Sequence, residues 1–136
     1  MANTLKLEVV TPEATVYSQE VEYAILTGVE GQMTVLPRHS RLMTQLVPSE
    51  MVVRRGGEDE FLAVGGGLVR ITGESVAVLT DMAVSAANID EAKVEEARRR
   101  AEARLKEKLS AEEVASVNAS LARSLAQIQV KRRRRT

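Results

Sequence analysis

Apolar residues change their spacing along the chain near residues 85–90. Before that stretch they recur at every second position, as in Leu5-Lys6-Leu7-Glu8-Val9, in short runs broken by Gly, Pro, Asn or Asp. After it there is no Gly or Pro, and apolar residues recur every three or four positions. A period of two is typical of half-buried strands, and a period near 3.6 is typical of amphipathic helices. The pattern predicts a β domain over residues 1–87 and a helical domain over residues 88–136.

Short apolar segments at even spacing fill the β domain, with turn residues between them. Gly56-Gly57 and Thr72-Gly73-Glu74 each separate two such segments, as in β-hairpins. This arrangement indicates an antiparallel β-sandwich or barrel, for which we expect about ten short strands. The clearest strand segments are Leu5–Val9, Val16–Ser18, Val21–Leu26, Met33–Leu36, Leu42–Leu46, Met51–Arg55, Glu60–Val64, Leu68–Ile71 and Ser75–Leu79.

The helical domain contains two helix starts. Asn88, with Glu91 three residues later, and Asp90 are alternative N-caps for the first helix. Ser110-Ala111-Glu112-Glu113 is a capping box for the second helix. Two helices of about twenty residues, each about 30 Å long, joined at Ser110 form an antiparallel hairpin. The fold class is therefore α+β, a sandwich followed by a two-helix hairpin.

The expected apolar stripes of the two helices differ in bulk. The stripes are Val94, Ala97, Ala101, Leu105 and Leu109, then Val114, Val117, Leu121, Leu125 and Ile128. Alanine buries little apolar area, at roughly 25 cal/mol per Å², so the first helix should hold the hairpin only modestly. Two interpretations remain open, a hairpin that detaches from the sandwich and an alanine-rich helix pair that never moves.

Charge divides the chain in the same place. The net charge is zero, but residues 1–87 carry six Lys/Arg against eleven Asp/Glu, a net of −5, and residues 88–136 carry thirteen against eight, a net of +5. An acidic or phosphorylated partner should therefore meet the C-terminal half first. The basic tail, residues 131–135, is compatible with nucleic acid, an acidic protein or solvent alone.

Composition excludes several classes of function. The chain has no Cys, one His and three aromatic residues, which argues against disulfides, thiolate chemistry, a His-rich metal site and base-stacking platforms. It has no apolar run long enough to span a bilayer and no leader pattern at its N-terminus. Gly65-Gly66-Gly67 is followed by a strand and no Lys-Ser/Thr pair, so we expect a tight turn or bulge with close backbone contacts rather than a P-loop. No set of residues forms a nucleophile–base–orienter group, so we expect no catalytic activity.

Several motifs resemble the epsilon subunit of F-type ATP synthases of the bacterial type. Residues 28–39, Gly-Val-Glu-Gly-Gln-Met-Thr-Val-Leu-Pro-Arg-His, resemble its G-x-E-G-x-x-x-(V/I)-L-P-x-H motif. Residues 65–69, 76–81 and 89–92 resemble the segments that follow in that family, in the same order. Arg41 stands where the family usually has Pro, and Gln32 where a carboxylate is common.

The resemblance implies a non-catalytic rotor subunit at the cytoplasmic face of the plasma membrane, reached only through its complex. The gamma subunit and the c-subunit ring would contact the sandwich, and the hairpin would extend into the alpha/beta catalytic head and inhibit ATP hydrolysis. The implied rotor interface is Glu30, Gln32, Pro37, Arg38, His39 and Arg41. The candidates for the inhibitory contact are Arg98, Arg99, Arg100, Arg104, Arg123, Arg132, Arg133, Arg134 and Arg135.

Some bacterial members of that family also bind ATP on the folded hairpin through an (I/L)-D-x-x-R-A motif. Ile89 and Asp90 match it, whereas Lys93 replaces Arg and Val94 replaces Ala. Lys keeps the charge but loses the bidentate geometry of Arg. The resemblance thus implies no required cofactor and a regulatory ATP site at Ile89, Asp90, Lys93, Arg100 and Arg123.

Overall fold

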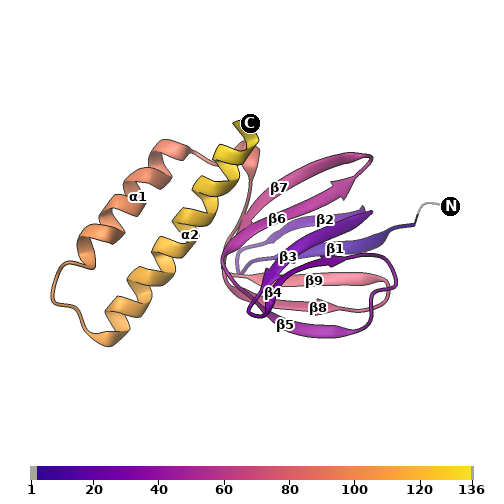
Figure 1. Ribbon diagram of the computed structural model, residues 1–136, viewed down its shortest axis with the longest axis horizontal. Coiled ribbons are helices and arrows are strands. Elements are labelled where there is room, and N and C mark those ends of the chain that lie inside the picture. The colour runs from indigo at the N-terminus through magenta and orange to yellow at the C-terminus, as the bar shows by residue number, and fades with distance from the viewer. Residues whose placement is uncertain (1–2, 136) are drawn as a thin grey trace.

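The computed structural model describes residues 3–135, with side chains for residues 3–132 (Figure 1). Within these residues, ten strands form a β-sandwich and two helices form a hairpin beside it. The strands are β1 (Leu5–Val10), β2 (Thr15–Val21), β3 (Tyr23–Gly28), β4 (Gly31–Val35), β5 (Leu42–Leu46), β6 (Ser49–Arg55), β7 (Glu58–Val64), β8 (Gly67–Ile71), β9 (Ser75–Thr80) and β10 (Ala83–Ser85). A 3-10 turn, η1 (Ala86–Asn88), leads to α1 (Glu91–Arg104) and α2 (Ala111–Arg135). The predicted α+β class and element order are confirmed.

One sheet folds over on itself to make both layers of the sandwich. Its strand order is β10-β7-β6-β3-β5-β8-β9-β1-β2, and β4 pairs with β3 off this path. The fold-over occurs at β3, because Tyr23–Ile25 pair with β6 whereas Gly28 pairs with Leu46 of β5. β1 and β9 are parallel, and the other strand pairs in residues 3–135 are antiparallel.

The period-two pattern of the sequence places one apolar face of each layer inside the sandwich. In β1, Leu5, Leu7 and Val9 are buried, whereas Glu8 is exposed. The same alternation continues in β8 and β9. The sandwich core contains Leu5, Leu7, Val9, Val21, Ala24, Leu26, Val35, Leu46, Met51, Val53, Leu62, Val64, Val69, Ile71, Val76 and Val78.

A side-chain hydrogen bond joins β2, one end of the strand order, to β7 near the other end. Tyr17 donates from Oη to Oε1 of Glu60 at 3.2 Å, and Arg55 donates from Nε to the same oxygen at 2.9 Å. Burial, followed by the negative charge of Glu60, raises the pKa of Tyr17 to about 12. The phenol therefore stays protonated and keeps this link at physiological pH.

The helix starts follow the predicted caps, whereas the helix lengths do not follow the prediction. Asp90 caps α1, because its Oδ1 accepts from the backbone N–H of Lys93 at 3.3 Å. At Ser110, the hydroxyl accepts from Glu113 N–H and the Glu113 carboxylate accepts from Ser110 N–H, each at 3.2 Å. This is the predicted capping box. The helices have 14 and 25 residues rather than twenty each, so Leu109 lies in the connecting loop.

The expected number of about ten strands is confirmed, and the tenth is the short strand β10, in which Ser85 pairs with Leu62 of β7. One other expectation about local structure is wrong. On α2, Leu125 is 47 % exposed and Val114 is 36 % exposed, whereas Ser124, Ala126, Ile128 and Val130 are buried. The buried surface of α2 is wider than one stripe because it contacts both α1 and the sandwich.

Candidate functional site

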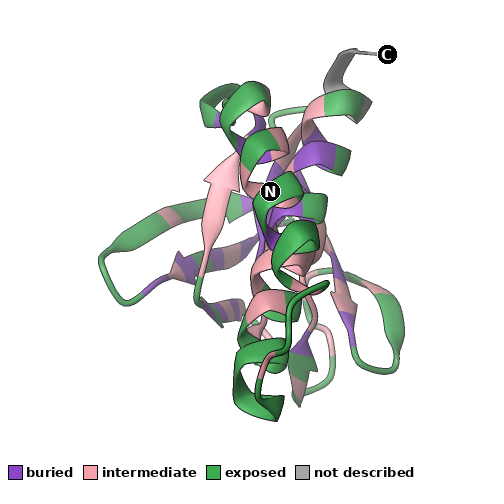
Figure 2. Cartoon of the chain, turned by 90° about the vertical axis from the view of Figure 1, so that its left-hand side faces the viewer, coloured by how far each residue is buried: buried purple, intermediate pink, exposed green. Residues whose placement is uncertain are grey.

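The hairpin is held on the sandwich by a second apolar cluster, separate from the sandwich core. Its buried members are Ala63, Ala86, Ile89, Val94, Ala126, Ile128 and Val130, with Phe61, Met82 and Val84 packed at its edge. We call this set the dock. Seen from the hairpin side, the helices are mostly exposed, with buried residues on the faces turned inward (Figure 2). The dock therefore joins the two domains through a small area.

α2 makes most of the contact with the sandwich. It packs on β6, β7 and η1, and α1 packs on the far side of α2 (Figure 1). A pattern in the sequence of β7 also indicates this surface. Phe61-Leu62-Ala63-Val64 breaks the period of two, and a continuous apolar run is typical of a strand covered on both faces. Leu62 and Val64 face the sandwich core, whereas Phe61 and Ala63 face α2.

Polar contacts surround the dock. Arg123 donates from Nη1 to Oδ2 of Asp81 in the loop between β9 and β10, at 3.3 Å. Farther along α2, Gln127 donates from Nε2 to Sδ of Met82 at 3.0 Å, and Lys131 donates from Nζ to the carbonyl oxygen of Ala86 at 3.3 Å. One face of α2 thus contacts the segment 81–86 over about two helical turns.

The glycine run places Asp81 where Arg123 can contact it. A Cβ on Gly65 would collide with the Asp81 carboxylate, and a Cβ on Gly67 would collide with the backbone of Leu79. The backbone N–H of Gly65 donates to Met82 at 2.8 Å, and that of Asp81 donates to Gly66 at 3.2 Å. The predicted close backbone approach is confirmed, in a bend between β7 and β8 that leaves room for the side chain that contacts α2.

The segment between the two domains is itself part of the dock. Ala86 is 1 % exposed and Ile89 is 4 % exposed. Asn88 donates from Nδ2 to the hydroxyl of Ser85 at 3.0 Å. Detaching the hairpin therefore requires that residues 85–90 also leave the dock, so this segment is not a free linker.

Most of the predicted inhibitory arginines are paired with carboxylates in this hairpin. The pairs are Arg98 with Glu95 and Glu102, Arg100 with Glu96, Arg104 with Glu113, Arg123 with Asp81, and Arg132 with Glu91 and Glu95. The hydrogen bond from Arg98 holds the pKa of Glu95 below its usual range. Arg99 has no such partner within the described side chains, and Arg133, Arg134 and Arg135 lie outside them. The role of these arginines stays a prediction.

The predicted ATP residues are not gathered in one place. Ile89 is buried in the dock, Asp90 caps α1, and Lys93 is exposed on the first turn of α1. Arg123 contacts Asp81, about 13 Å along α2 from Arg132, which contacts the first turns of α1. ATP binding at these residues stays a prediction.

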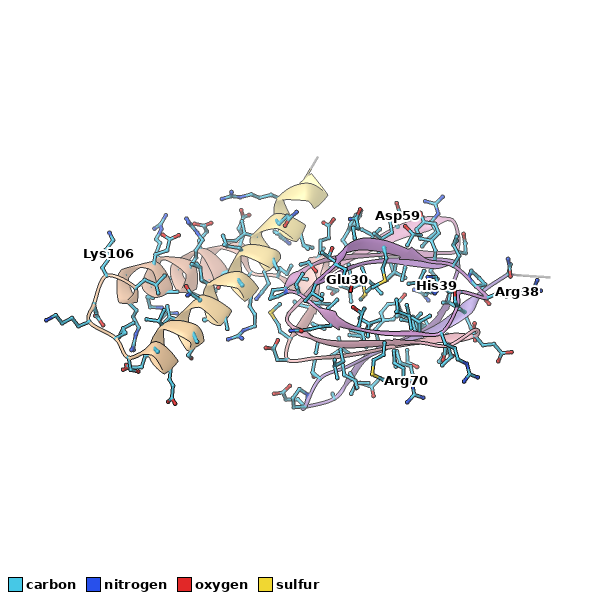
Figure 3. All side chains as sticks on the ribbon, turned by 60° about the horizontal axis from the view of Figure 1, so that its bottom comes forward. Glu30, Arg38, His39, Asp59, Arg70 and Lys106 are labelled. Carbon is cyan, nitrogen blue, oxygen red and sulfur yellow. The ribbon has the colours of Figure 1, made fainter. Side chains whose placement is uncertain are left out.

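The predicted rotor residues lie along the whole length of β4 rather than at one end of the sandwich. Glu30 lies at the end facing the hairpin, whereas Arg38 and His39 lie at the opposite end (Figure 3). Arg38 has φ 67, and its backbone N–H donates to Gly73 at 2.9 Å. A non-glycine residue in the left-handed region is strained, and such strain concentrates at functional loops. Gln32 lies on β4, and Pro37 and Arg41 lie in the loop between β4 and β5.

An apolar patch on the outer face of the sandwich was not predicted. Leu68 of β8 lies opposite Leu79 of β9, which lies opposite Val10 of β1. Leu68 and Leu79 are 48 % and 50 % exposed. A shallow cavity of about 480 Å³ adjoins this row, lined by Val10, Thr11, Pro12, Gly66, Gly67, Leu79, Thr80 and Asp81. Contiguous exposed apolar residues mark interaction surfaces.

Two family models match the chain and together cover almost all of it. The model "ATP synthase, Delta/Epsilon chain, beta-sandwich domain" matches residues 4–86. The model "ATP synthase, Delta/Epsilon chain, long alpha-helix domain" matches residues 87–132.

Curated relatives and a solved structure agree with these matches. An ATP synthase epsilon chain from Herminiimonas arsenicoxydans is 39 % identical over 94 % of this chain and 93 % of its own length. An ATP synthase epsilon chain from Psychrobacter cryohalolentis is 40 % identical over 96 % of this chain and 95 % of its own length. A chain in the cryo-EM structure of the Euglena gracilis mitochondrial ATP synthase (OSCP/F1/c-ring) has the same fold, with a TM-score of 0.75. That chain is 23 % identical, and the match covers 90 % of this chain and 77 % of that one.

Proposed function

Because the chain belongs to the ATP synthase delta/epsilon family, we propose that it couples proton flow to ATP synthesis as a rotor subunit and inhibits ATP hydrolysis through its C-terminal helices. As an epsilon-type subunit of the central stalk, it is a stalk component of the complex rather than the catalytic one. Among the described residues, no helix is long and apolar enough to cross a membrane. The proposed location is the cytoplasmic face of the plasma membrane, held there by the complex.

The separation of the two apolar clusters carries the inhibitory part of the proposal. The sandwich core and the dock share no buried residue, so the hairpin can detach without opening the sandwich core. Three of the seven buried dock residues are alanines, which contribute little apolar area. Elements that move are drawn from the less stable parts of a fold. Of the two interpretations of the hairpin, the dock favours the one in which it detaches.

The outer apolar patch supports the rotor part. Leu68, Leu79 and Val10 are the surface at which we place the gamma subunit, because an obligate stalk contact requires apolar area. The edge along β4, from Glu30 to His39, is then left for the c-subunit ring. Arg38 at its end is held in the strained turn described above.

Detachment of the hairpin would expose its arginines to new partners. In the docked hairpin, Arg123 and Arg132 contact Asp81, Glu91 and Glu95. When α2 leaves the sandwich, Arg123 loses Asp81 and must find another anion. An acidic surface of the alpha/beta catalytic head is the proposed recipient, and the basic tail, residues 132–135, is proposed to contact it as well.

The proposal is tested in the assembled complex with two variants that prevent the helices from reaching the head. One ends after Ala87. The other places cysteines at Met82 and Gln127, whose side chains are in contact, and joins them with a short thiol cross-linker. The chain has no other cysteine, so the cross-link is unambiguous.

We expect ATP hydrolysis to rise in both variants and to fall again when a reducible cross-link is opened. Both variants should still assemble and support ATP synthesis. Unchanged hydrolysis in both would remove the inhibitory role and leave the rotor role intact. Failure of the truncated sandwich to assemble, with the full-length chain assembling normally, would contradict the assignment of the rotor contact to the sandwich.

A further inference from the structure

Two arginines lie around an exposed apolar floor on the outer face of β5 and β8. Met43 of β5 is the cross-strand partner of Arg70 of β8, and Met43 is 63 % exposed. Arg41 immediately precedes β5 and is exposed. A shallow cavity of about 400 Å³ lies here, lined by Arg41, Leu42, Met43, Arg70, Ile71 and Thr72. Figure 3 shows Arg70 at the outer side of the sandwich, remote from the hairpin.

Neither arginine has a carboxylate partner within the described side chains. The salt bridges found among residues 3–132 include Arg54 and Arg55 of the sandwich and five arginines of the hairpin, but not Arg41 or Arg70. The surrounding sandwich domain has a net charge of −5. Two guanidinium groups without a salt bridge therefore lie beside the exposed Met43 on a domain whose net charge is negative.

The chemistry of this surface fits a protein segment that carries a carboxylate beside an apolar side chain. A guanidinium binds a carboxylate through two parallel hydrogen bonds. Met43 is flexible and polarisable, and such side chains adapt to a partner's shape.

An anionic membrane fits this surface less well. Recognition of anionic lipid headgroups takes clusters of about four to eight Lys or Arg residues, and the cavity has two. The acidic domain around them would be repelled by a negatively charged membrane surface or by nucleic acid. A short acidic segment avoids most of that repulsion because its contact is local.

This surface is continuous with the apolar patch assigned to the gamma subunit. Met43 and Arg70 lie two residues along their strands from Gln45 and Leu68, which are also cross-strand partners. Residues two apart on a strand share a face of the sheet. The arginines therefore border the same interface.

We propose that Arg41 and Arg70, with Met43 between them, recognise an acidic, partly apolar segment of the rotor partner that contacts the apolar patch. This inference rests on the proposed rotor role. Charged groups at the edge of an interface mainly set specificity and the rate of association. The two arginines would fix the orientation of the sandwich on its partner, and the apolar patch would supply most of the affinity.

The test measures binding of the full-length chain to the purified gamma subunit with its c-ring by biolayer interferometry at low and high salt. The variants are Arg41→Glu/Arg70→Glu and the milder Arg41→Gln/Arg70→Gln. The matched control is Lys106→Glu/Lys108→Glu, which changes charge equally on the exposed α1–α2 loop. We expect about tenfold weaker binding for the Glu variant, a smaller loss for the Gln variant, less than a twofold change for the control, and less salt dependence in both arginine variants.

The outcomes separate this inference from the rotor role. If the wild-type chain does not bind the gamma subunit with its c-ring, the rotor role itself fails. If it binds, and the arginine variants bind equally tightly while melting like the wild type, the rotor role stands and this inference is overturned. Co-sedimentation with vesicles containing phosphatidylglycerol is the second measurement. If the wild-type chain binds these vesicles and the Gln variant does not, the surface recognises lipid, and the proposal of an acidic protein segment is overturned.

Discussion

Arg123 of α2 and Asp81 of the β9–β10 loop form the ion pair between the hairpin and the sandwich, with 3.3 Å between Nη1 and Oδ2. The two residues are 42 positions apart in the sequence. Their side chains are 33 % and 52 % exposed, so solvent screens the pair. The dock supplies the apolar contact, and this pair adds a weak polar contact at its edge.

Removing the Asp81 charge should loosen the hairpin slightly without affecting the sandwich. For Asp81→Asn we expect a loss of about 0.5 kcal/mol or less in docking free energy, because exposed ion pairs are weak. Hydrogen exchange of α2 amides should accelerate about twofold while β-sheet amides keep their protection. Arg100→Ala is the control, since Arg100 pairs only within α1, with Glu96 at 3.9 Å. Equal effects of the two substitutions would contradict a docking role for Asp81.

Adding a methyl group at Gly65 should displace Asp81 and loosen the hairpin through geometry alone. Gly65→Ala places a Cβ against the Asp81 carboxylate, whereas Gly73→Ala places one in open space. We expect the first to cost about 1–3 kcal/mol of stability and the second to have little effect. Thermal unfolding measures the cost, and α2 amide exchange shows whether docking is lost first. Equal melting temperatures would show that Asp81 moves aside freely.

Truncating Ile128 should detach the hairpin more effectively than truncating any exposed residue of α2. Ile128 is 5 % exposed in the dock, whereas Leu125 is 47 % exposed. We expect Ile128→Ala to cost about 2–4 kcal/mol of docking free energy and Leu125→Ala to stay within about 0.5 kcal/mol. Proteolysis at residues 85–90 provides the measurement, because these residues are protected only while docked. Equal cleavage of both variants would place the buried face of α2 elsewhere.

The capping box should make the start of α2 sensitive to acid. The backbone hydrogen bond from Ser110, followed by its side-chain hydrogen bond, lowers the pKa of Glu113. Folding therefore favours the ionised form of Glu113. The contribution of this carboxylate to the free energy of unfolding is complete above its unfolded pKa of about 4.3. It is lost as pH falls through the lower pKa of the folded state.

Helix content measured by circular dichroism between pH 6 and pH 3 tests the acid sensitivity of the start of α2. Ser110→Ala should cost about 1 kcal/mol at neutral pH, and Glu113→Gln, which removes the titrating carboxylate, should flatten the pH dependence. Glu112→Gln, which alters the neighbouring carboxylate outside the box, should leave the pH dependence unchanged. An acid transition of the same size in wild type and Glu113→Gln would rule out the capping box as its source.

Replacing Lys93 with Arg should increase any affinity of the hairpin for ATP. Lys93 is exposed, so Lys93→Arg changes the binding geometry without changing the dock. Arg binds phosphate bidentately, and Lys binds it as a point charge. We expect Lys93→Arg to bind ATP more tightly in isothermal calorimetry, with Lys106→Arg unchanged. No heat at millimolar ATP in either chain would remove the nucleotide site.

Local chemistry determined much of this protein without tertiary information. Alternation in Leu5–Val9 fixes which face of β1 is buried, the glycines at 56 and 57 adopt positive φ in the predicted hairpin, and Ser110 with Glu113 form the predicted capping box. Each feature depends on residues at most a few positions apart, so the sequence contains all the partners. The motifs at residues 28–39 and 65–69 identified the family for the same reason.

Only the tertiary structure decided which surfaces meet. Whether Leu125 or Ala126 is buried depends on how α2 is rotated against β7, and an amphipathic pattern with small residues on two faces does not determine that rotation. Whether Arg123 finds Asp81, and whether Arg41 and Arg70 flank Met43, depends on the order of strands in the folded sheet. Those contacts join distant segments, and their energies exist only once the sheet has brought the segments together.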